Sequence, residues 1–487
     1  MRPRLRFLDD ALAGRILDEA RTVLATLGVA IHDPEGLDLL VSHGGTVDDG
    51  GTRVRIPASL VDRALATAPR AFALYDVLGN PTHDLSGENV HFTPGSAAIR
   101  ILDPATQALR APVTADYVRF AKLVAVLPHL AAQSTAFVPS DVPPEISDSY
   151  RLFLGLLHCE KPVVTGAFSA DAFRVMLDLQ LAVRGTKAAL REKPLAVFTC
   201  CPTSPLAWSE ATGRNLLDCA RAGIPVEIVA VPLAGFLSPV TLTGTLVQGA
   251  AENLSGLVLH QLAAPGAPVL WGTSAAVFDI RSEGAATGAV ETAMLTCAMG
   301  EIGKRLGLPT QGYAGVSDAK ELDAQAGLET SSGALLAALS GINSISGPGL
   351  LDLDNGFSLE KLVVDHEICG MALRLARGIE PREDFPALPL LGELLAEKHL
   401  LIARHTRRHL RAEITFPGPV IDRSSEARWH ADGSETLLAR AASEVERLVA
   451  AWTPSRLPDT VKRDLAGVME AEARRAGLDT LPARGDA

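Results

Sequence analysis

The segment 312–329 combines several kinds of chemically active side chain within a few residues. Its first part carries Tyr313, Asp318 and Lys320 within one short, glycine-bearing loop. The loop follows a short apolar stretch and leads into a pattern typical of a helix. A strand that ends in a polar loop before a helix is how a (β/α) barrel presents its active-site groups. We therefore predict that this loop borders an active site.

Aromatic rings near other predicted strand ends indicate which kind of ligand the site holds. Trp271, Phe278 and Phe357 join Tyr313 as candidates, while most remaining strand ends carry hydroxyl groups, so the predicted mouth is neutral and partly aromatic. A quaternary ammonium has no N–H to donate, and aromatic faces or oxygen dipoles hold such a cation. These four rings therefore predict a cation-binding site, in which Asp318 and Lys320 meet the polar end of the substrate or order the loop.

Each candidate also has a purely structural interpretation. A tryptophan at a strand end commonly packs in the core, and Asp318 with Lys320 can form a surface ion pair at a helix start. Carboxylates at that place also favour the helix dipole. His366 lies inside a predicted helix and is interpreted as a partly exposed helix histidine, and Arg281 pairs with a neighbouring carboxylate or with a substrate carboxylate. No side chain is assigned as catalytic acid, base or nucleophile.

Motifs for several other chemistries are missing from the sequence. It contains no HExxH, GxSxG or P-loop motif, and no carboxylates at the spacing of metal ligands. The adjacent Cys200 and Cys201 are interpreted as reduced, buried thiols, because neighbouring cysteines rarely ligate one metal. We therefore predict no metal site in this chain.

Short apolar segments alternate with helical patterns between residues 91 and 378. The predicted strands occupy 91–92, 131–138, 162–168, 194–200, 225–231, 268–273, 308–312 and 343–346. The predicted helices occupy 114–126, 147–158, 170–183, 209–221, 242–263, 286–306, 323–339 and 359–377. Such regular alternation predicts an α/β fold, and it favours a closed (β/α)8 TIM barrel over an open doubly wound sheet.

The flanking segments predict two additions to the barrel domain, 91–380. Residues 1–90 read as a small N-terminal α/β subdomain, with an amphipathic helix over 9–27 and a tight turn at 48–51. Residues 381–487 read as a mostly helical C-terminal extension, with one helix over 391–410 and two more before residue 476. A tail of this kind covers the barrel or forms a contact between two copies, so a homo-oligomer is expected and a dimer is plausible.

Charge and composition exclude several partners. The 45 Lys and Arg residues are outnumbered by 57 Asp and Glu, and a formal charge of −12 argues against nucleic acid or anionic membrane as a partner. No segment approaches about 18 consecutive apolar residues, so no membrane span is expected. The six cysteines show no CxxC spacing and indicate reduced thiols in a cytoplasmic protein.

Motifs spread along nearly the whole chain point to one known family. They lie at 27–34, 55–57, 137–143, 312–320, 323–327, 343–349, 358–365 and 405–407. Together they resemble the trimethylamine methyltransferase family. The resemblance implies a TIM barrel that transfers a methyl group from a methylated amine to the cobalt of a separate corrinoid protein.

The sequence departs from the founding members of that family in one respect. The members that demethylate trimethylamine carry pyrrolysine, whereas this chain has only the twenty standard residues. The resemblance is therefore to the non-pyrrolysine branch, which includes enzymes that act on glycine betaine, proline betaine or carnitine. A quaternary nitrogen leaves as a neutral amine, so positioning and desolvation of the cation suffice without an acid.

The sequence contains no Asp-x-His-x-x-Gly cobalamin motif. We therefore expect no cofactor bound by this chain itself, and cobalamin carried by a partner protein that docks at the barrel mouth. Two alternatives remain open, namely direct methyl transfer to a tetrahydrofolate and a non-catalytic barrel that binds betaine-like ligands. The sequence does not name the methylated amine.

Overall fold

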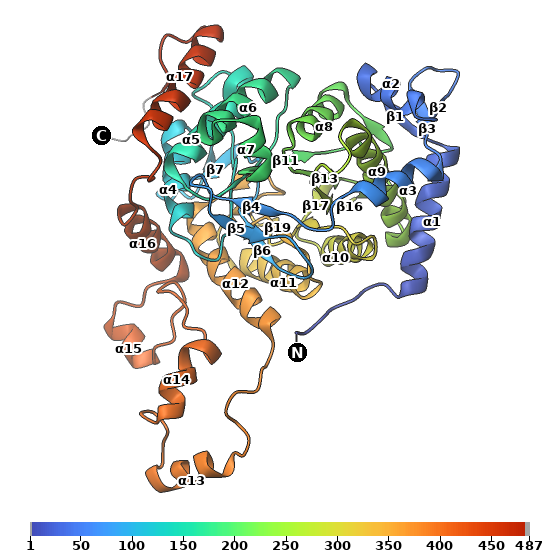
Figure 1. Cartoon of the computed structure of the whole chain (residues 1–487). Coiled ribbons are helices and arrows are strands. Elements are labelled where there is room, and N and C mark those ends of the chain that lie inside the picture. Colours follow the sequence, from blue (N-terminus) through green and yellow to red (C-terminus); the bar gives the residue numbers. More distant parts are fainter. Residues whose placement is uncertain (1, 483–487) are drawn as a thin grey trace.

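The computed structural model describes residues 2–482 and has a mixed α/β fold (Figure 1). Its central strands are parallel and form two sheets, in the orders β15-β13-β11-β10-β9 and β18-β19-β6. These strands are β6 (His91–Thr93), β9 (Gln133–Ser134), β10 (Val163–Thr165), β11 (Ala196–Cys200), β13 (Val226–Ala230), β15 (Val269–Thr273), β18 (Gln311–Tyr313) and β19 (Ser344–Ser346). The strand predicted over 131–138 is shorter than expected, because only Gln133 and Ser134 pair with β10.

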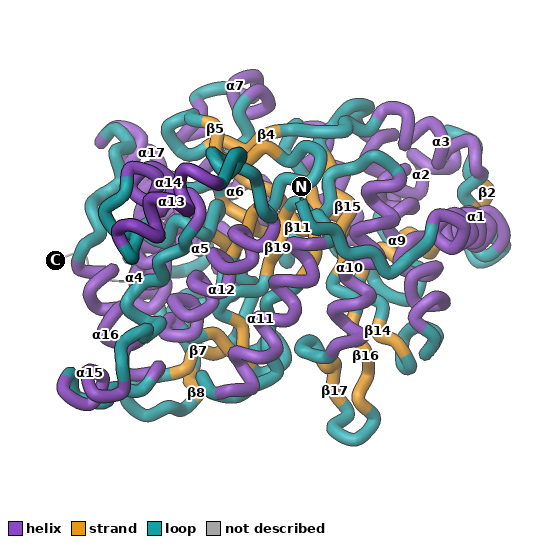
Figure 2. Tube along the Cα trace, turned by 90° about the horizontal axis from the view of Figure 1, so that it is seen from below, coloured by secondary structure: helices purple, strands orange, loops and turns teal. Residues whose placement is uncertain are grey.

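A long helix follows each of these strands and lies outside them (Figure 2). The helices are α4 (Thr114–Ala125), α5 (Pro144–His158), α6 (Ala170–Arg184), α8 (Glu210–Ala222), α9 (Leu242–Ala263), α10 (Val290–Arg305), α11 (Ala324–Leu339) and α12 (Leu359–Arg377). The predicted alternation of strands and helices is thereby confirmed. One short helix, α7 (Lys187–Glu192), was not expected.

Isolated bridges lie beside the ends of the two sheets. Phe92 of β6 pairs in parallel with Leu130, just before β9, and Trp271 of β15 pairs in parallel with Thr310, just before β18. Each end of the five-stranded sheet therefore neighbours an end of the three-stranded sheet.

Side-chain caps fix where several of the helices begin. Ser209, Asp323 and Ser358 each accept a hydrogen bond from a backbone N–H three residues further on, which satisfies one free donor of the first turn of α8, α11 and α12. These caps determine the lengths of the loops that lead from the strands into the helices.

Additional short strands lie within the loops at the carboxyl ends of the parallel strands. Three pairs are antiparallel: β7 with β8, β16 with β17, and β20 with β21. The bounds are β7 (Arg100–Leu102), β8 (Leu109–Arg110), β12 (Ala207–Trp208), β14 (Leu233–Ala234), β16 (Ala276–Asp279), β17 (Gly284–Ala286), β20 (Leu350–Leu351) and β21 (Gly356–Phe357). Figure 2 shows β7, β8, β16 and β17 along one edge of the molecule.

The N-terminal segment packs against the outer helices α8 and α9. Its helices α1 (Asp10–Thr26) and α3 (Ala58–Thr67) contact α9, and α2 (Pro34–Ser42) contacts both α8 and α9. Its strands β1 (Val29–Ile31), β2 (Thr46–Val47) and β3 (Arg53–Arg55) form one sheet with β12, and the predicted turn at 48–51 joins β2 to β3. A hairpin of β4 (Ala73–Tyr75) and β5 (Pro81–Asp84) buries Leu74 against Val197 and Leu270.

The C-terminal segment has two parts. Its last helices pack on the body, α16 (Leu437–Ala450) against α4 and α12, and α17 (Asp459–Arg475) against α5 and α6. Before them, α13 (Leu388–Glu397) and α14 (Arg404–Glu413) project away from the body, and α15 (Glu426–Ala431) leads back (Figure 1). The single helix predicted over 391–410 is wrong, because Lys398 takes a left-handed backbone conformation that ends α13.

Candidate active site

A cavity of about 280 Å³ opens at the carboxyl ends of the parallel strands. Thr165, Thr199 and Tyr313, which lie at or near the ends of β10, β11 and β18, contribute to its wall. The other lining residues are Ser96, Ala97, Thr135, Arg151, Gly166, Ala167, Phe168, Cys201, Thr212, Val229, Val231, Ser274 and Asp354. The predicted loop residue Tyr313 thus lies where parallel α/β folds bind their ligands.

Tyr313 is held at the cavity wall by its hydroxyl. The Oη atom donates to the backbone carbonyl of Ser96 over 3.0 Å and lies 3.3 Å from the Ser96 Oγ. Burial raises the pKa of Tyr313 above its ordinary value, so the phenol is neutral at physiological pH. A fixed neutral ring at the wall suits contact with a cation and is unsuited to proton abstraction.

Asp354 brings a carboxylate to the cavity from the turn between β20 and β21. Asp352, Leu353 and Asp354 all adopt left-handed backbone angles, with φ of 51°, 56° and 68°. Such a conformation is unfavourable for residues other than glycine and concentrates at functional sites. The Oδ1 atom of Asp354 is buried and has no hydrogen-bond partner among residues 2–482. Burial and the neighbouring Asp318 raise the pKa of Asp354 to about 7.

A second buried carboxyl, Glu227, lies next to the cavity. It stands on β13 two residues before the lining residue Val229, so both side chains project from the same face of the strand. The hydroxyl of Thr199 donates to its Oε1 over 2.6 Å, while its Oε2 has no hydrogen-bond partner in the described part of the chain. Burial raises the pKa of Glu227 to about 7.

Arg151 of α5 supplies a positive charge to the same cavity. Its guanidinium donates to Asp148 over 2.6 Å and to the carbonyl of Thr135 over 2.9 Å, and its Nε donates to the carbonyl of Ser147. An arginine has five N–H donors, so two remain beyond these three bonds. The exposed ring of Phe168 lies over the guanidinium at 5.5 Å.

These three charged residues correct the prediction of a neutral mouth. Glu227 was overlooked because the strand predicted over 225–231 is otherwise apolar. Arg151 was overlooked because nothing in the α5 sequence indicates that one of its side chains reaches a cavity. Asp354 belongs to a segment that is visibly polar in the sequence. The direction of its side chain, however, depends on the left-handed backbone of three successive residues, which the sequence does not reveal.

The other polar candidates of the predicted loop lie next to the cavity and do not line it. Asp318 accepts hydrogen bonds at 2.7 to 3.1 Å from the hydroxyl and backbone N–H of Thr287 and from the backbone N–H of Gly288. Burial raises the pKa of its carboxyl. Lys320 is exposed and donates to the backbone carbonyl of Asp318 over 2.6 Å. These hydrogen bonds tie Asp318 to the segment 287–288 and Lys320 to its own loop.

Three of the predicted aromatic residues lie away from the cavity. Trp271 is 2% exposed, and its indole donates to the carbonyl of Met299 on the outer helix α10. Phe357 is fully buried and packs edge-on against Phe120 at a centroid distance of 5.4 Å. Phe278 on β16 stacks on Phe236 at 4.9 Å, in a hairpin at the rim. The cavity therefore contains Tyr313 and Phe168 as its aromatic residues.

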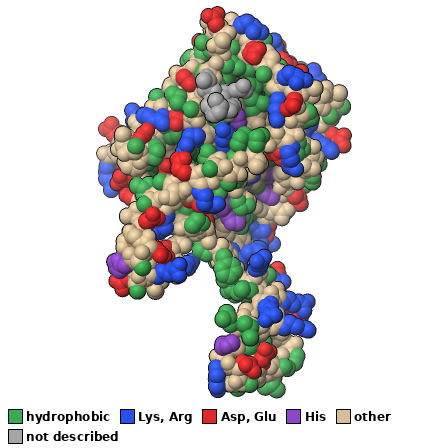
Figure 3. All heavy atoms as spheres, turned by 90° about the vertical axis from the view of Figure 1, so that its left-hand side faces the viewer, with side chains coloured by type: hydrophobic (Ala, Val, Ile, Leu, Met, Phe, Trp, Pro, Cys, Tyr) green, Lys and Arg blue, Asp and Glu red, His purple; other side chains and the backbone are tan. Residues whose placement is uncertain are grey.

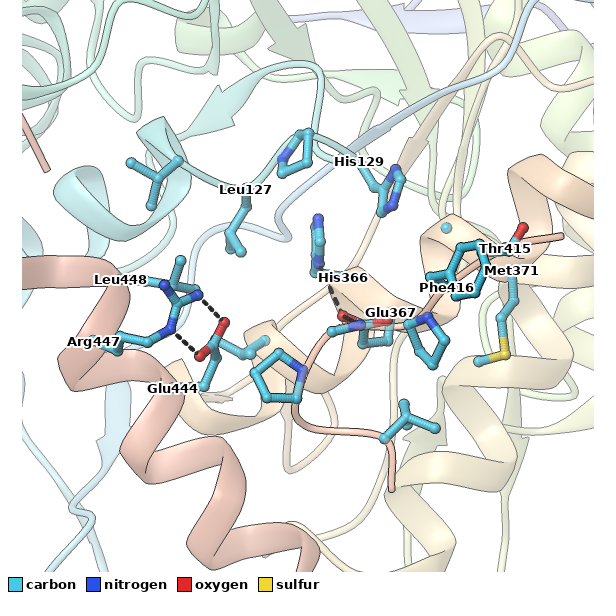
Figure 4. Close-up of a pocket in the computed structure, with 18 of the residues that line it drawn as sticks. Leu127, His129, His366, Glu367, Met371, Thr415, Phe416, Glu444, Arg447 and Leu448 are labelled. Atoms are coloured by element: carbon cyan, nitrogen blue, oxygen red, sulfur yellow. Dashed lines mark hydrogen bonds and ion pairs between the residues drawn. The ribbon is translucent and has the colours of Figure 1, made fainter. Parts of the chain in front are cut away.

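The remaining candidates also lie outside the cavity. Arg281 is exposed and pairs with Asp279 over 2.5 Å, which is the local pairing considered above. His366 lines a different cavity beside the C-terminal segment, where it stacks on His129 with ring centroids 4.5 Å apart (Figure 4). Among residues 2–482, no group of three or more His, Cys, Asp or Glu side chains has an arrangement that could hold a metal ion.

The motif residues behind the family resemblance form one buried network under the cavity loops. Lys361 donates to Asp365 over 2.5 Å and to Thr330 of α11 over 2.8 Å. Asp365 accepts the backbone N–H of Gly349 over 2.7 Å. This network ties α12 and α11 to the segment that follows β19.

Comparison with known proteins identifies the class of this chain. It is 30% identical over 94% of its length to a trimethylamine methyltransferase, MttB, of Desulfitobacterium hafniense, of which the match covers 92%. It is 27% identical to a glycine betaine methyltransferase of the same species, over 98% of both chains. In fold it is similar to the monomethylamine methyltransferase MtmB of Methanosarcina barkeri, with a TM-score of 0.51, 11% identity, and coverage of 96% of this chain and 88% of that one.

These relatives are methyltransferases, and this chain is an enzyme of that class. The family model described as trimethylamine methyltransferase (MTTB) matches residues 1–477, and the chain belongs to that family. The family predicted from the sequence is thereby confirmed. Within residues 2–482, no helix is both long and apolar enough to cross a membrane.

Proposed function

We propose that this enzyme takes a methyl group from a quaternary, betaine-like amine and transfers it to the Co(I) centre of a separate corrinoid protein. The observation that carries the proposal is the cavity with Tyr313 and Asp354 on its wall and Glu227 beside it. An aromatic ring and ionisable carboxyls attract a cation that has no N–H to donate. The glycine betaine methyltransferase among the relatives supports the same substrate class.

Arg151 favours a substrate that also carries a carboxylate. Its two unused N–H groups match a carboxylate, while Asp354 and Tyr313 attract the ammonium group. A betaine carries both charges on one small molecule. Trimethylamine lacks a carboxylate, so it offers no acceptor to the two N–H groups of Arg151 that Asp148, Thr135 and Ser147 leave unused.

The residues of the cavity position the substrate and exclude water. A corrinoid partner supplies the nucleophile for the methyl carbon, and the C–N electron pair stays on nitrogen, which leaves as a neutral tertiary amine. The reaction therefore needs no proton from Tyr313, Glu227 or Asp354. Holding the C–N bond in line with the nucleophile and removing water around the cation are the contributions we assign to this chain.

We further propose that the eight parallel strands close into a (β/α)8 barrel. The bridges Phe92–Leu130 and Trp271–Thr310 support closure, because they bring the two sheets together at both ends. The barrel domain then spans 91–380, between an N-terminal α/β subdomain over 1–90 and a helical extension over 381–487. The six free cysteines support a cytoplasmic location, where thiols stay reduced.

Exposed apolar side chains around the cavity support docking of the corrinoid protein at the mouth. They lie on the loops after the parallel strands or at the first turns of the following helices. They are Ile99, Phe168, Val231, Phe236, Val240, Ile280, Val290 and Leu328. A polar rim would suffice for a small substrate alone, whereas an apolar rim fits a protein surface.

One assay tests the proposed function. The purified protein is incubated with glycine betaine and Co(I) cobalamin, with and without a candidate corrinoid protein, and methylcobalamin is followed by absorbance. We expect methylcobalamin to form faster than in the protein-free control. Methyl transfer to tetrahydrofolate without cobalamin would support the folate alternative. Tight binding of betaines without transfer to either acceptor would support a non-catalytic binding protein.

Replacing rim residues should weaken docking without weakening substrate binding. The double variant Phe236→Asp/Ile280→Asp places two carboxylates in the apolar rim. Because these side chains are 65% and 79% exposed, we expect the variant to fold normally. We expect the KM for the corrinoid protein to rise at least about 10-fold, because each buried carboxylate loses solvation. Calorimetric affinity for tetramethylammonium should stay unchanged. An unchanged KM would contradict docking at this rim.

Affinity for the cation should increase with pH. Glu227 and Asp354 have pKa values of about 7, raised by burial, so both are mostly protonated at pH 6 and mostly ionised at pH 8. Only the ionised forms attract a cation, so binding favours proton release and tightens as pH rises through 7. We expect a gain of about 10-fold per carboxyl between pH 6 and pH 8. Titration calorimetry with tetramethylammonium, which does not itself titrate, measures this change.

A further inference from the structure

Residues 380–416 form an arm that projects from the body (Figures 1 and 3). The arm contains α13 and α14, and neither helix buries any of its residues within the described part of the chain. Its base is attached by Arg374 of α12, which donates to the carbonyl of Glu413, and by the backbone N–H of Gly418, which donates to Glu367. The arm is therefore attached at its base, and the rest of the described chain does not cover its two helices.

The arm exposes an apolar stripe typical of a helix that packs on another surface. Leu388, Leu391 and Leu395 follow the i, i+3, i+7 spacing of one face of α13, and they are 80%, 51% and 72% exposed. In all, nine large apolar side chains of the arm are exposed: Phe385, Leu388, Leu391, Leu395, Leu401, Ile402, Leu410, Ile414 and Phe416. Exposed apolar surfaces of this extent mark sites of association.

The position of the arm separates it from the mouth of the cavity. Helix α12 begins at Ser358, beside the loops of the cavity, and ends at Gly378, where the arm starts. The arm therefore leaves the body at the end of α12 that lies away from the cavity. Figure 2 likewise shows α13 and α14 on the side of the molecule opposite to the hairpins β7–β8 and β16–β17. A protein docked at the mouth does not cover the arm.

A receiving surface lies on the body next to the base of the arm. Met371 and Leu375, one turn apart on α12, are 41% and 49% exposed. Beside Met371 lies a cavity of about 360 Å³, which Phe416, His129 and His366 also line (Figure 4). One copy of the chain thus carries both a projecting apolar element and, beside Met371, a hollow lined by apolar and charged side chains.

The charges of the two arm helices are complementary to each other. Helix α13 carries Glu393 and Glu397 and no Lys or Arg, whereas α14 carries four arginines and one glutamate. Arg408 pairs with Glu383, whereas Arg404, Arg407 and Arg411 have no ion-pair partner among residues 2–482. When two copies meet across a two-fold axis, α13 of one copy can face α14 of the other with opposite charges together.

We propose that the arm pairs two copies of this chain, each arm packing on the arm and on the α12 surface of the other copy. The interface is self-complementary, as a two-fold contact requires, because it matches projection with hollow and acidic helix with basic helix. Burial of one leucine or phenylalanine removes on the order of 100 Å² of apolar surface. Nine such side chains provide roughly the 800 Å² per partner of a stable interface. The pairing is independent of the function proposed above.

The oligomeric state of the full chain tests this proposal. The wild type is measured by size exclusion with light scattering at roughly 1 to 50 µM. We expect a molar mass that corresponds to an even number of chains, two in the simplest case. Leu391→Asp/Leu395→Asp should raise the dissociation constant at least about 100-fold, because the interface would bury carboxylates. Met371→Asp/Leu375→Asp, on the receiving surface, should do the same. The milder Leu391→Ser/Leu395→Ser serves where the aspartates impair folding.

Matched controls separate pairing from general damage. Leu27→Asp changes a leucine of similar exposure, 59%, at the end of α1, and should leave the oligomeric state unchanged. Glu393→Lys/Glu397→Lys alone and Arg404→Glu/Arg407→Glu alone should each weaken association at low ionic strength, and their combination should restore it. A wild type of one chain at every concentration, or an assembly that neither the arm nor the α12 variants weaken, would overturn the proposal.

Discussion

Replacing Asp354 by asparagine is expected to lower the affinity for tetramethylammonium by about 10- to 100-fold at pH 8. The substitution keeps the shape of the side chain and removes the negative charge. A unit charge near a partly desolvated cation contributes a few kcal/mol at an effective dielectric constant of about 20, and a 10- to 100-fold change corresponds to about 1.4 to 2.8 kcal/mol. Since Asp354 lines the cavity and its buried Oδ1 has no hydrogen-bond partner among residues 2–482, this oxygen is available to a ligand.

A neighbouring residue provides the matched control for this variant. Asp352 lies in the same turn and also has a left-handed backbone, but its nearest charged partner is the exposed Lys320, at 3.9 Å. Asp352→Asn should therefore leave the cation affinity within about twofold of the wild type. The Asp354 variant should also show a weaker pH dependence of binding, because one of the two titrating carboxyls is gone. Equal affinities of the Asp354 variant and the wild type at pH 8 would contradict its role.

The fold was predictable because its signals are local and repeated. Proline residues lie one or two positions before several of the strands, and serine or aspartate caps mark several of the helices, so each boundary is encoded within a few residues. The arm was the exception. Its break at Lys398 depends on a left-handed residue that carries no glycine or proline signal, so the sequence favoured one continuous helix.

The site was predictable only in part, because it depends on which way side chains point. Tyr313 was predicted to lie at the mouth and does line the cavity, since a polar loop at a strand end lies at the mouth in any parallel α/β fold. Trp271 shows the limit, because neighbouring residues of a strand face opposite sides, and here the indole faces α10. Arg151 could not be predicted from the strand ends, since its guanidinium reaches the cavity from a helix packed beside the strands. Phe357 was placed near the correct loop, but it packs against Phe120 in the core.

Removing one partner of the buried ion pair under the cavity is expected to destabilise the protein strongly. Lys361 and Asp365 are 0% and 1% exposed, and Lys361→Met leaves the carboxylate of Asp365 without its cation. Removal of one partner of a buried pair destabilises a protein by about 3 to 5 kcal/mol. Urea unfolding followed by circular dichroism should therefore show a much lower midpoint, and the loops held through Gly349 should loosen with it.

Two further variants distinguish loss of the pair from loss of a lysine. Lys361→Met/Asp365→Leu removes both charges and should recover much of the lost stability, because no unpaired charge remains buried. Lys462→Met breaks a surface pair with Asp459, 3.9 Å apart, and should change stability by less than about 1 kcal/mol. If the single Lys361 variant were as stable as the Lys462 variant, the pair would not be the anchor that joins α12 to α11 and to the segment after β19. The family motifs at 343–349 and 358–365 would then need another physical explanation, because this network is what brings their residues into contact.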